Sequence, residues 1–162
     1  MKNGRLFQFI HFIHAFKSAI VAACEDLFNG DPASDVISLK NYGKVLFLIA
    51  KNAGALGTAT ITVESCDDVT PTTATAIPFK YWKNTSGDTW SDMTAATASG
   101  FVTTAGADQM YAIEVDASEL YDTDGFVRLQ ITETVDDPVD GMVFALAGDA
   151  RYLHEVKPTA LS

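Results

Sequence analysis

The feature that most constrains the fold is an uninterrupted apolar run, Val45–Ala50, bounded by turn residues on both sides. Its six residues are enough for a strand and too few for a helix. The β-branched and aromatic side chains favour a strand, and the lack of polar residues on either face predicts burial on both faces. The run is therefore predicted to be a central strand or an assembly contact.

Other segments repeat with a period of two. Thr58–Glu64 alternates, with Ala59, Ile61 and Val63 predicted inward and Thr60, Thr62 and Glu64 outward, which is typical of a half-buried antiparallel strand. Met142–Ala147 is a second continuous apolar strand. In Ala76–Trp82, Pro78 cannot donate a ladder hydrogen bond and so predicts a sheet edge. Further strands are predicted over Val36–Leu39, Thr89–Met93, Phe101–Thr104, Met110–Val115 and Phe126–Thr132.

Eight or nine short strands, with turn signals about every ten residues, predict an all-β antiparallel β-sandwich, either jelly-roll-like or immunoglobulin-like. One helical turn is expected at Asp116–Leu120, where Asp116 is the cap and Glu119 its reciprocal partner.

The start of the chain has a different period. Polar residues at helical spacing (Gln8, His11, His14, Lys17 and Glu25) predict an amphipathic helix over Leu6–Phe28, ended by Asn29–Pro32. The chain is thus divided into an N-terminal helical segment (1–31), a β-sandwich domain (32–150) and a C-terminal tail (151–162).

This predicted helix carries more apolar surface than one sheet face can cover, which indicates contact with another chain. We expect a homo-oligomer, a dimer or trimer, or docking on a larger lattice. The predicted partner-binding residues are Leu6, Phe9, Ile10, Ile13, Phe16, Ile20 and Phe47.

Charge narrows the possible partners. A net charge of −10 over 162 residues repels nucleic acid and anionic membranes, so neither is an expected partner. Cys24 and Cys66 are isolated and are expected to be reduced thiols of a cytosolic product. Val21–Cys24 resembles a lipoprotein cleavage box, but Gln8, His11, His14 and Lys17 interrupt the hydrophobic region that a signal peptide requires. No uncharged apolar run is long enough for a transmembrane helix.

No catalytic constellation can be assembled, so neither an enzyme nor a cofactor is expected. His11 and His14 lie three residues apart but lack a nearby third ligand, and are expected to be solvated. Asp122–Gly125 resembles the opening of a calcium loop without its later ligands, which favours a hairpin turn. A sugar-stacking platform remains an alternative to core packing for five aromatic residues. These are Tyr81, Trp82, Trp90, Tyr111 and Tyr121.

Several strand segments together carry a family resemblance. They are Val36–Lys44, Thr60–Glu64, Cys66–Pro71, Ala76–Phe79, Ser86–Trp90, Gly100–Gly106, Tyr111–Asp116, Phe126–Leu129, Pro138–Gly141 and Arg151–Tyr152. In these segments the chain resembles a family of small structural proteins of tailed bacteriophages and prophages. Residues 1–17 depart from the family pattern, so the site of attachment need not be shared.

The resemblance implies a virion protein made in the host cytoplasm. By analogy with other small sandwich proteins, it implies a capsid decoration or cement protein that binds the major capsid protein or other virion proteins. The alternatives are a receptor- or glycan-binding module of a head or tail fibre, and a tail or connector component.

Overall fold

The computed structural model describes residues 10–15, 26–52, 56–121, 124–151 and 160. This part of the chain forms antiparallel strands and one short 3-10 turn, η2 (Ala117–Glu119). The six-stranded sheet has the order β1 (His11–His14), β11 (Gly141–Ala150), β3 (Tyr42–Lys51), β9 (Gln109–Asp116), β6 (Phe79–Asn84) and β7 (Thr94–Ala96). The five-stranded sheet has the order β2 (Ile37–Ser38), β10 (Phe126–Val135), β4 (Thr58–Cys66) and β5 (Ala74–Ile77), with β8 (Phe101–Val102) also paired to β4.

One hydrophobic core lies between the sheets. Along β3 the inward residues Val45, Phe47 and Ile49 are fully buried, and on the other sheet so are the inward residues of β4 and β10. Side chains of both sheets belong to the same buried cluster. The described part of the chain is therefore all-β with a sandwich-like arrangement, as the short alternating strands predicted.

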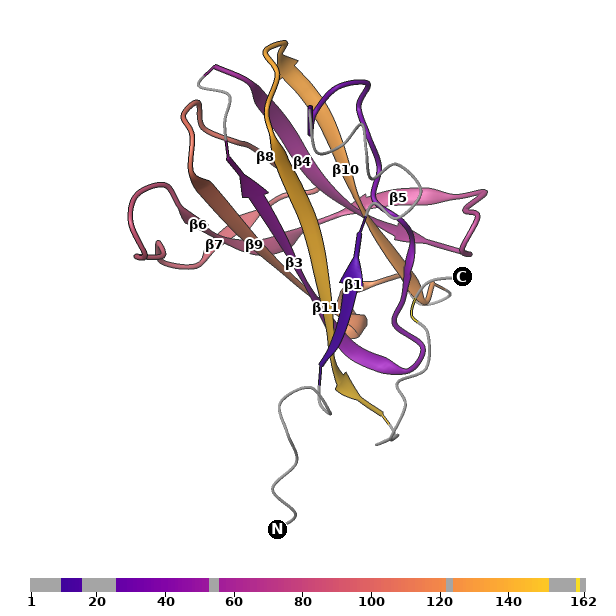
Figure 1. The fold of residues 1–162 in the computed structure, drawn as a ribbon. Coiled ribbons are helices and arrows are strands. Elements are labelled where there is room, and N and C mark those ends of the chain that lie inside the picture. Colours follow the sequence, from indigo (N-terminus) through magenta and orange to yellow (C-terminus); the bar gives the residue numbers. More distant parts are fainter. Residues whose placement is uncertain (1–9, 16–25, 53–55, 122–123, 152–159, 161–162) are drawn as a thin grey trace.

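The apolar run at Val45–Ala50 is confirmed as part of a central strand. β3 pairs with β11 on one side and with β9 on the other, and Figure 1 shows gold β11 between β1 and β3. The predicted burial on both faces is wrong in detail, because Leu46, Leu48 and Ala50 face away from the core and are only half-buried.

The predicted N-terminal helix is wrong where the structure describes it. Residues 11–14 form β1, antiparallel to β11, with His11 opposite Ala147 and His14 opposite Phe144. The same residues suit a period of two, since Ile13 and Ala15 are both buried. Pairing also satisfies backbone groups along β11 that would otherwise form an open edge. Positions 6–9 and 16–25 of the predicted helix lie outside the described residues.

Pro78 divides a segment that was predicted to be one edge strand. β5 ends at Ile77 in the five-stranded sheet, and β6 begins at Phe79 in the six-stranded sheet. Because Pro78 has no backbone N–H, the ladder cannot continue through it, and the chain changes sheets there. Ile77 and Phe79 are both buried, one from each sheet.

Candidate interaction face

The outer surface of the six-stranded sheet is apolar at its centre. Leu48 of β3 lies opposite Phe144 of β11 and Ala112 of β9. On one side Ala50 lies between Met142 and Met110, and on the other Leu46 lies between Leu146 and the charged Glu114. These outward residues are half-buried or exposed, except Ala112, which neighbouring side chains cover. We call this surface the apolar face. It comprises Leu46, Leu48, Ala50, Met110, Ala112, Met142, Phe144 and Leu146.

The outer surface of the other sheet is mainly polar, as the alternation of Thr58–Glu64 predicted, with exposed Val102 of β8 opposite Thr60 as an apolar exception. Arg128 Nε donates to Glu64 Oε2 (2.7 Å) across β10 and β4. Gln130 lies opposite Thr62, and Thr132 opposite Thr60. An antiparallel sheet with one solvated face normally shows this polar pattern, so the apolar face of the six-stranded sheet is the exception that needs a functional explanation.

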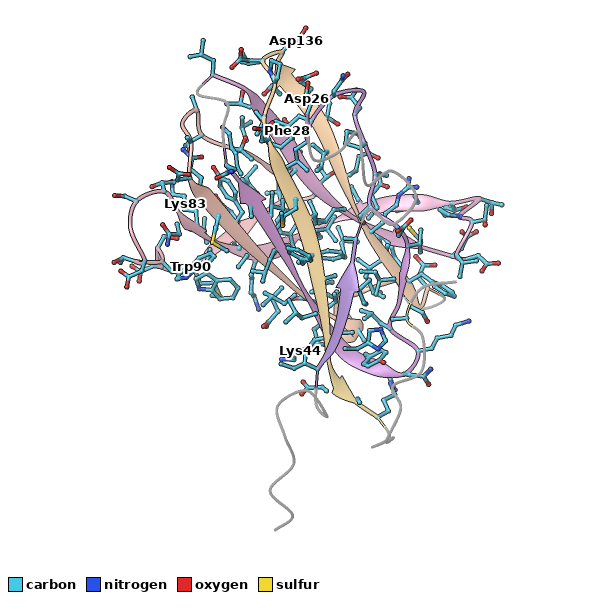
Figure 2. All side chains as sticks on the ribbon, viewed as in Figure 1. Asp26, Phe28, Lys44, Lys83, Trp90 and Asp136 are labelled. Atoms are coloured by element: carbon cyan, nitrogen blue, oxygen red, sulfur yellow. The ribbon has the colours of Figure 1, made fainter. Side chains whose placement is uncertain are left out.

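Charged residues border the apolar face at one end. Lys44 Nζ lies 3.9 Å from Glu114 Oε1 and 3.6 Å from Asp149 Oδ2. Lys44, Leu46, Glu114, Leu146 and Ile10 also line a shallow hollow of about 340 Å³. Figure 2 shows Lys44 at this end of the molecule and Asp26 and Asp136 at the other.

The predicted partner-binding residues fall in different places. Ile10 lines the hollow beside Leu46 and Leu146. Ile13 and Phe47 are buried in the chain's own core, so neither side chain reaches its surface. The remaining predictions, Leu6, Phe9, Phe16 and Ile20, lie outside the described residues.

The sequence did contain a signal for the face. In Val45–Ala50 and in Met142–Ala147, the positions that alternate with the core residues carry no charged side chain. A period of two turns every second residue outward, so each run contributes an apolar row to the surface. Met110 belongs to the predicted strand Met110–Val115, whose outward positions include the charged Glu114, so its place on the apolar face followed only from its register opposite Ala50.

A buried polar cluster closes the other end of the face. Lys51 continues the inward series of β3, is only 2% exposed, and donates through Nζ to the carbonyls of Gly57 (2.7 Å) and Thr104 (3.0 Å). Burial lowers the pKa of Lys51, and the negative charge of Asp137 partly offsets this. The ammonium of Lys51 therefore links the segments around Gly57 and Thr104 to the end of β3.

His11, which was expected to be solvated, and Asp124 of the predicted hairpin turn each have a protein partner. His11 Nδ1 lies 3.2 Å from the hydroxyl of buried Tyr42, and the rings meet edge to face. Asp124 Oδ2 accepts from Ser65 Oγ (2.7 Å), while residues 122–123 of the acidic turn lie outside the described residues. Over the described residues, no three His, Cys, Asp or Glu side chains are grouped to hold a metal ion, and no helix is long and apolar enough to cross a bilayer.

The aromatic residues do not gather into one platform. Tyr81 stacks on Phe101 with ring centroids 4.0 Å apart, and Tyr111 is buried against the same phenylalanine. Trp90 and Tyr121 are exposed, and Figure 2 shows Trp90 beside Lys83 at one side of the molecule. Core packing therefore accounts for two of the five aromatics proposed for sugar stacking.

The fold and the apolar face define the class of this protein over its described residues. It is an all-β protein with two antiparallel sheets, one with a mainly polar outer surface and the other with an apolar outer surface. Comparison with family models, with curated proteins and with solved structures finds no match for this chain.

Proposed function

We propose that this chain is a non-enzymatic structural protein of a bacteriophage virion, a capsid decoration or cement protein that binds major capsid subunits through the apolar face. The observation that carries the proposal is the contrast between the two sheets, one with a polar outer surface and one with an apolar outer surface. The sequence resemblance supplies the virion context. The same face can also hold copies together as a dimer or trimer.

The strand order supports a jelly-roll-like arrangement, a fold common in viral capsid domains. A jelly roll has eight strands in two sheets. The strand order is first, eighth, third, sixth in one sheet and second, seventh, fourth, fifth in the other. The strands β1, β2, β3, β4, β5, β6, β10 and β11 follow this order when β7, β8 and β9 are set aside. β9 is then an addition between the third and sixth strands.

The mechanism is mass action. A protein that binds only the assembled shell stabilises it in proportion to its concentration relative to its dissociation constant. Burying a leucine side chain contributes about 1.5 to 3 kcal/mol, so a few outward residues of the apolar face offset much of the cost of association.

The proposal is tested by adding purified protein back to virions that lack it. Leu48→Lys places a charge at the centre of the apolar face, and Thr62→Lys makes a matched change on the polar sheet. We expect wild type and Thr62→Lys to bind the particles and restore heat resistance, and Leu48→Lys to bind at least about ten-fold more weakly. Both variants must first show wild-type circular dichroism.

Two results would contradict the proposal. If virions without the protein keep their resistance to heat and dilution, the cement role is wrong. If the two lysine variants bind equally well, another surface makes the contact. A receptor- or glycan-binding fibre module, the alternative function, instead predicts selective binding on a glycan array that Trp90→Ala removes, since Trp90 is an exposed aromatic.

A further inference from the structure

A hollow of about 490 Å³ lies where the apolar face meets the ends of β3, β9 and β11. Ala50, Met110 and Met142 provide its apolar surface, and the two methionine residues are 37% and 40% exposed. Methionine is flexible and polarisable, so it adapts to varied apolar partners. We call this feature the methionine hollow.

The rim of the methionine hollow is held by the backbone. The N–H of Asn52 donates to the carbonyl of Asp140, and the N–H of Asp108 donates to the carbonyl of Asn52, both at 2.8 Å. Three chain segments are thereby fixed to one another. Beneath them, Gln109 Oε1 accepts from the hydroxyls of Tyr111 (2.8 Å) and Thr104 (3.1 Å). A rim fixed in this way does not have to be ordered when a partner binds.

The charges on the rim are negative. Asp108 and Asp140 line the hollow, and no ion pair among the described residues involves either carboxylate. Lys51 also lines the hollow, but the residue is only 2% exposed and its ammonium donates to the carbonyls of Gly57 and Thr104, so a bound partner makes no direct ion pair with it. The surrounding end of the molecule, marked in Figure 2 by Asp26 and Asp136, is acidic as well.

The negative charge of the rim determines which kind of partner can occupy the methionine hollow. A two-fold contact centred on the hollow would place the same patch on both sides and bring the rim carboxylates of two acidic chains together. A contact between copies that is centred elsewhere on the apolar face would not. An apolar side chain flanked by lysine or arginine satisfies both parts of the site: the apolar group fills the space between the methionines, and the cations approach the carboxylates.

We infer that the methionine hollow binds a segment of a partner protein in which an apolar anchor residue is flanked by basic residues. The inference deepens the proposed function, because it names the chemistry that the apolar face recognises at this end. It can fail independently, since the particle assay changes Leu48 and the test below uses no particle.

The test is methionine-methyl NMR of the full chain titrated with the peptide acetyl-Gly-Lys-Leu-Arg-Gly-amide. We expect the Met110 and Met142 signals to shift and saturate in the millimolar range, and the signal of Met93, which is 54% exposed and does not line the hollow, to stay in place. Peptides with Glu replacing both basic residues, or Ser replacing Leu, should shift neither methionine.

Charge variants supply the matched control. Asp108→Asn and Asp140→Asn should each weaken binding of the basic peptide about two- to five-fold, and Asp92→Asn, which removes the same charge elsewhere, should not. Asparagine tolerates the left-handed backbone of residue 108 (φ 55°), so the fold is preserved. Added salt should reduce the differences between wild type and the Asp108 and Asp140 variants.

Three outcomes would overturn the inference: unshifted Met110 and Met142 signals, equal binding of the basic and acidic peptides, and methionine shifts that depend on protein concentration alone. The last of these would show that a second copy occupies the hollow. Each leaves the particle-binding result of Leu48→Lys unaffected, so failure of the inference and failure of the proposed function are distinguishable.

Discussion

At the scale of single residues, Glu133 is the least well satisfied carboxylate of the described chain. Its Oε1 is buried without a hydrogen-bond partner among the described residues. Burial raises the pKa of Glu133, and so do the negative charges of Asp136, Asp26 and Asp31. The backbone of Glu133 does have a hydrogen-bond partner, since its N–H donates to Asp31 Oδ1 (2.7 Å).

Glu133→Gln should therefore stabilise the fold near neutral pH. The folded-state pKa lies above the ordinary value of 4.5, so ionisation of Glu133 disfavours the folded state as pH rises above that value. Because the side chain is partly exposed, we expect a gain of only about 0.5 kcal/mol at pH 7 that disappears below about pH 4. Urea unfolding at both pH values measures it.

Glu64→Gln is the contrasting control for that measurement. It weakens the 2.7 Å ion pair with Arg128, which neighbouring side chains partly bury, and should destabilise by about 1 kcal/mol at pH 7. Equal or lower stability of Glu133→Gln at pH 7 would show that the carboxylate is accommodated in solution.

Local sequence patterns predicted some residue roles and missed others. The capping box is confirmed: the Ser118 N–H donates to Asp116 Oδ1 (2.9 Å), and the Asp116 N–H donates to Glu119 Oε2 (3.0 Å). All its partners lie within four residues, so the sequence contains the whole motif. The burial of Lys51 was missed, because its carbonyl partner on Thr104 is far away in the chain.

At the scale of elements, the turn between β7 and β8 depends on glycine. Gly100 has φ of 75°, and a Cβ at this position would collide with the Ile61 carbonyl of the neighbouring strand β4. Gly87 has a similar φ of 65°, but a Cβ there would meet nothing within 4 Å. Alanine at Gly87 would therefore suffer backbone strain alone, whereas alanine at Gly100 would suffer both backbone strain and steric overlap.

Gly87→Ala should cost about 1 kcal/mol, which is the strain of a left-handed alanine. Gly100→Ala should cost about 3 kcal/mol or more, because the overlap with β4 adds to that strain and the backbone must shift. Chemical denaturation of both variants measures the difference. Equal losses would mean that the β7–β8 turn moves freely away from β4.

The same scale shows where prediction from sequence failed. The segment around His11–His14 fits both helical and alternating patterns, and the choice depends on the edge of β11, which lies far away in the sequence. Pro78 was predicted to mark an edge strand that runs through it, whereas the chain changes sheets there, and this change depends on the packing of Ile77 and Phe79. Long-range pairing decides both cases, whereas local alternation located most of the strands. The strand predicted at Thr89–Met93 is wrong, since β7 is formed by the next residues, Thr94–Ala96.

At the scale of the whole molecule, Cys66 reports on the integrity of the sandwich-like core. It is fully buried at the end of β4, and burial chiefly raises its pKa to about 11. Only the thiolate reacts with disulfide reagents. The folded chain should therefore protect this thiol in two ways, by exclusion of the reagent and by suppression of ionisation.

In a Cys24→Ser background, Cys66 should react with a disulfide reagent at pH 8 at least about 100-fold more slowly in the folded chain than in urea. The shift in pKa accounts for about that factor alone, and the rate should rise in step with unfolding followed by circular dichroism. Rapid labelling without denaturant would reveal local opening of β4 from β5 or β10.

The pairing of β3 with β11 has a consequence for how the protein is made. Tyr42 lies opposite Ala150 and Lys51 opposite Gly141, so β3 leaves the ribosome about a hundred residues before its neighbour. At ordinary elongation rates this is a delay on the order of 5 to 20 s. β9 can pair with one edge of β3 earlier, but the edge that β11 covers stays open throughout that interval, so capture by a chaperone competes with aggregation before the sheet can close.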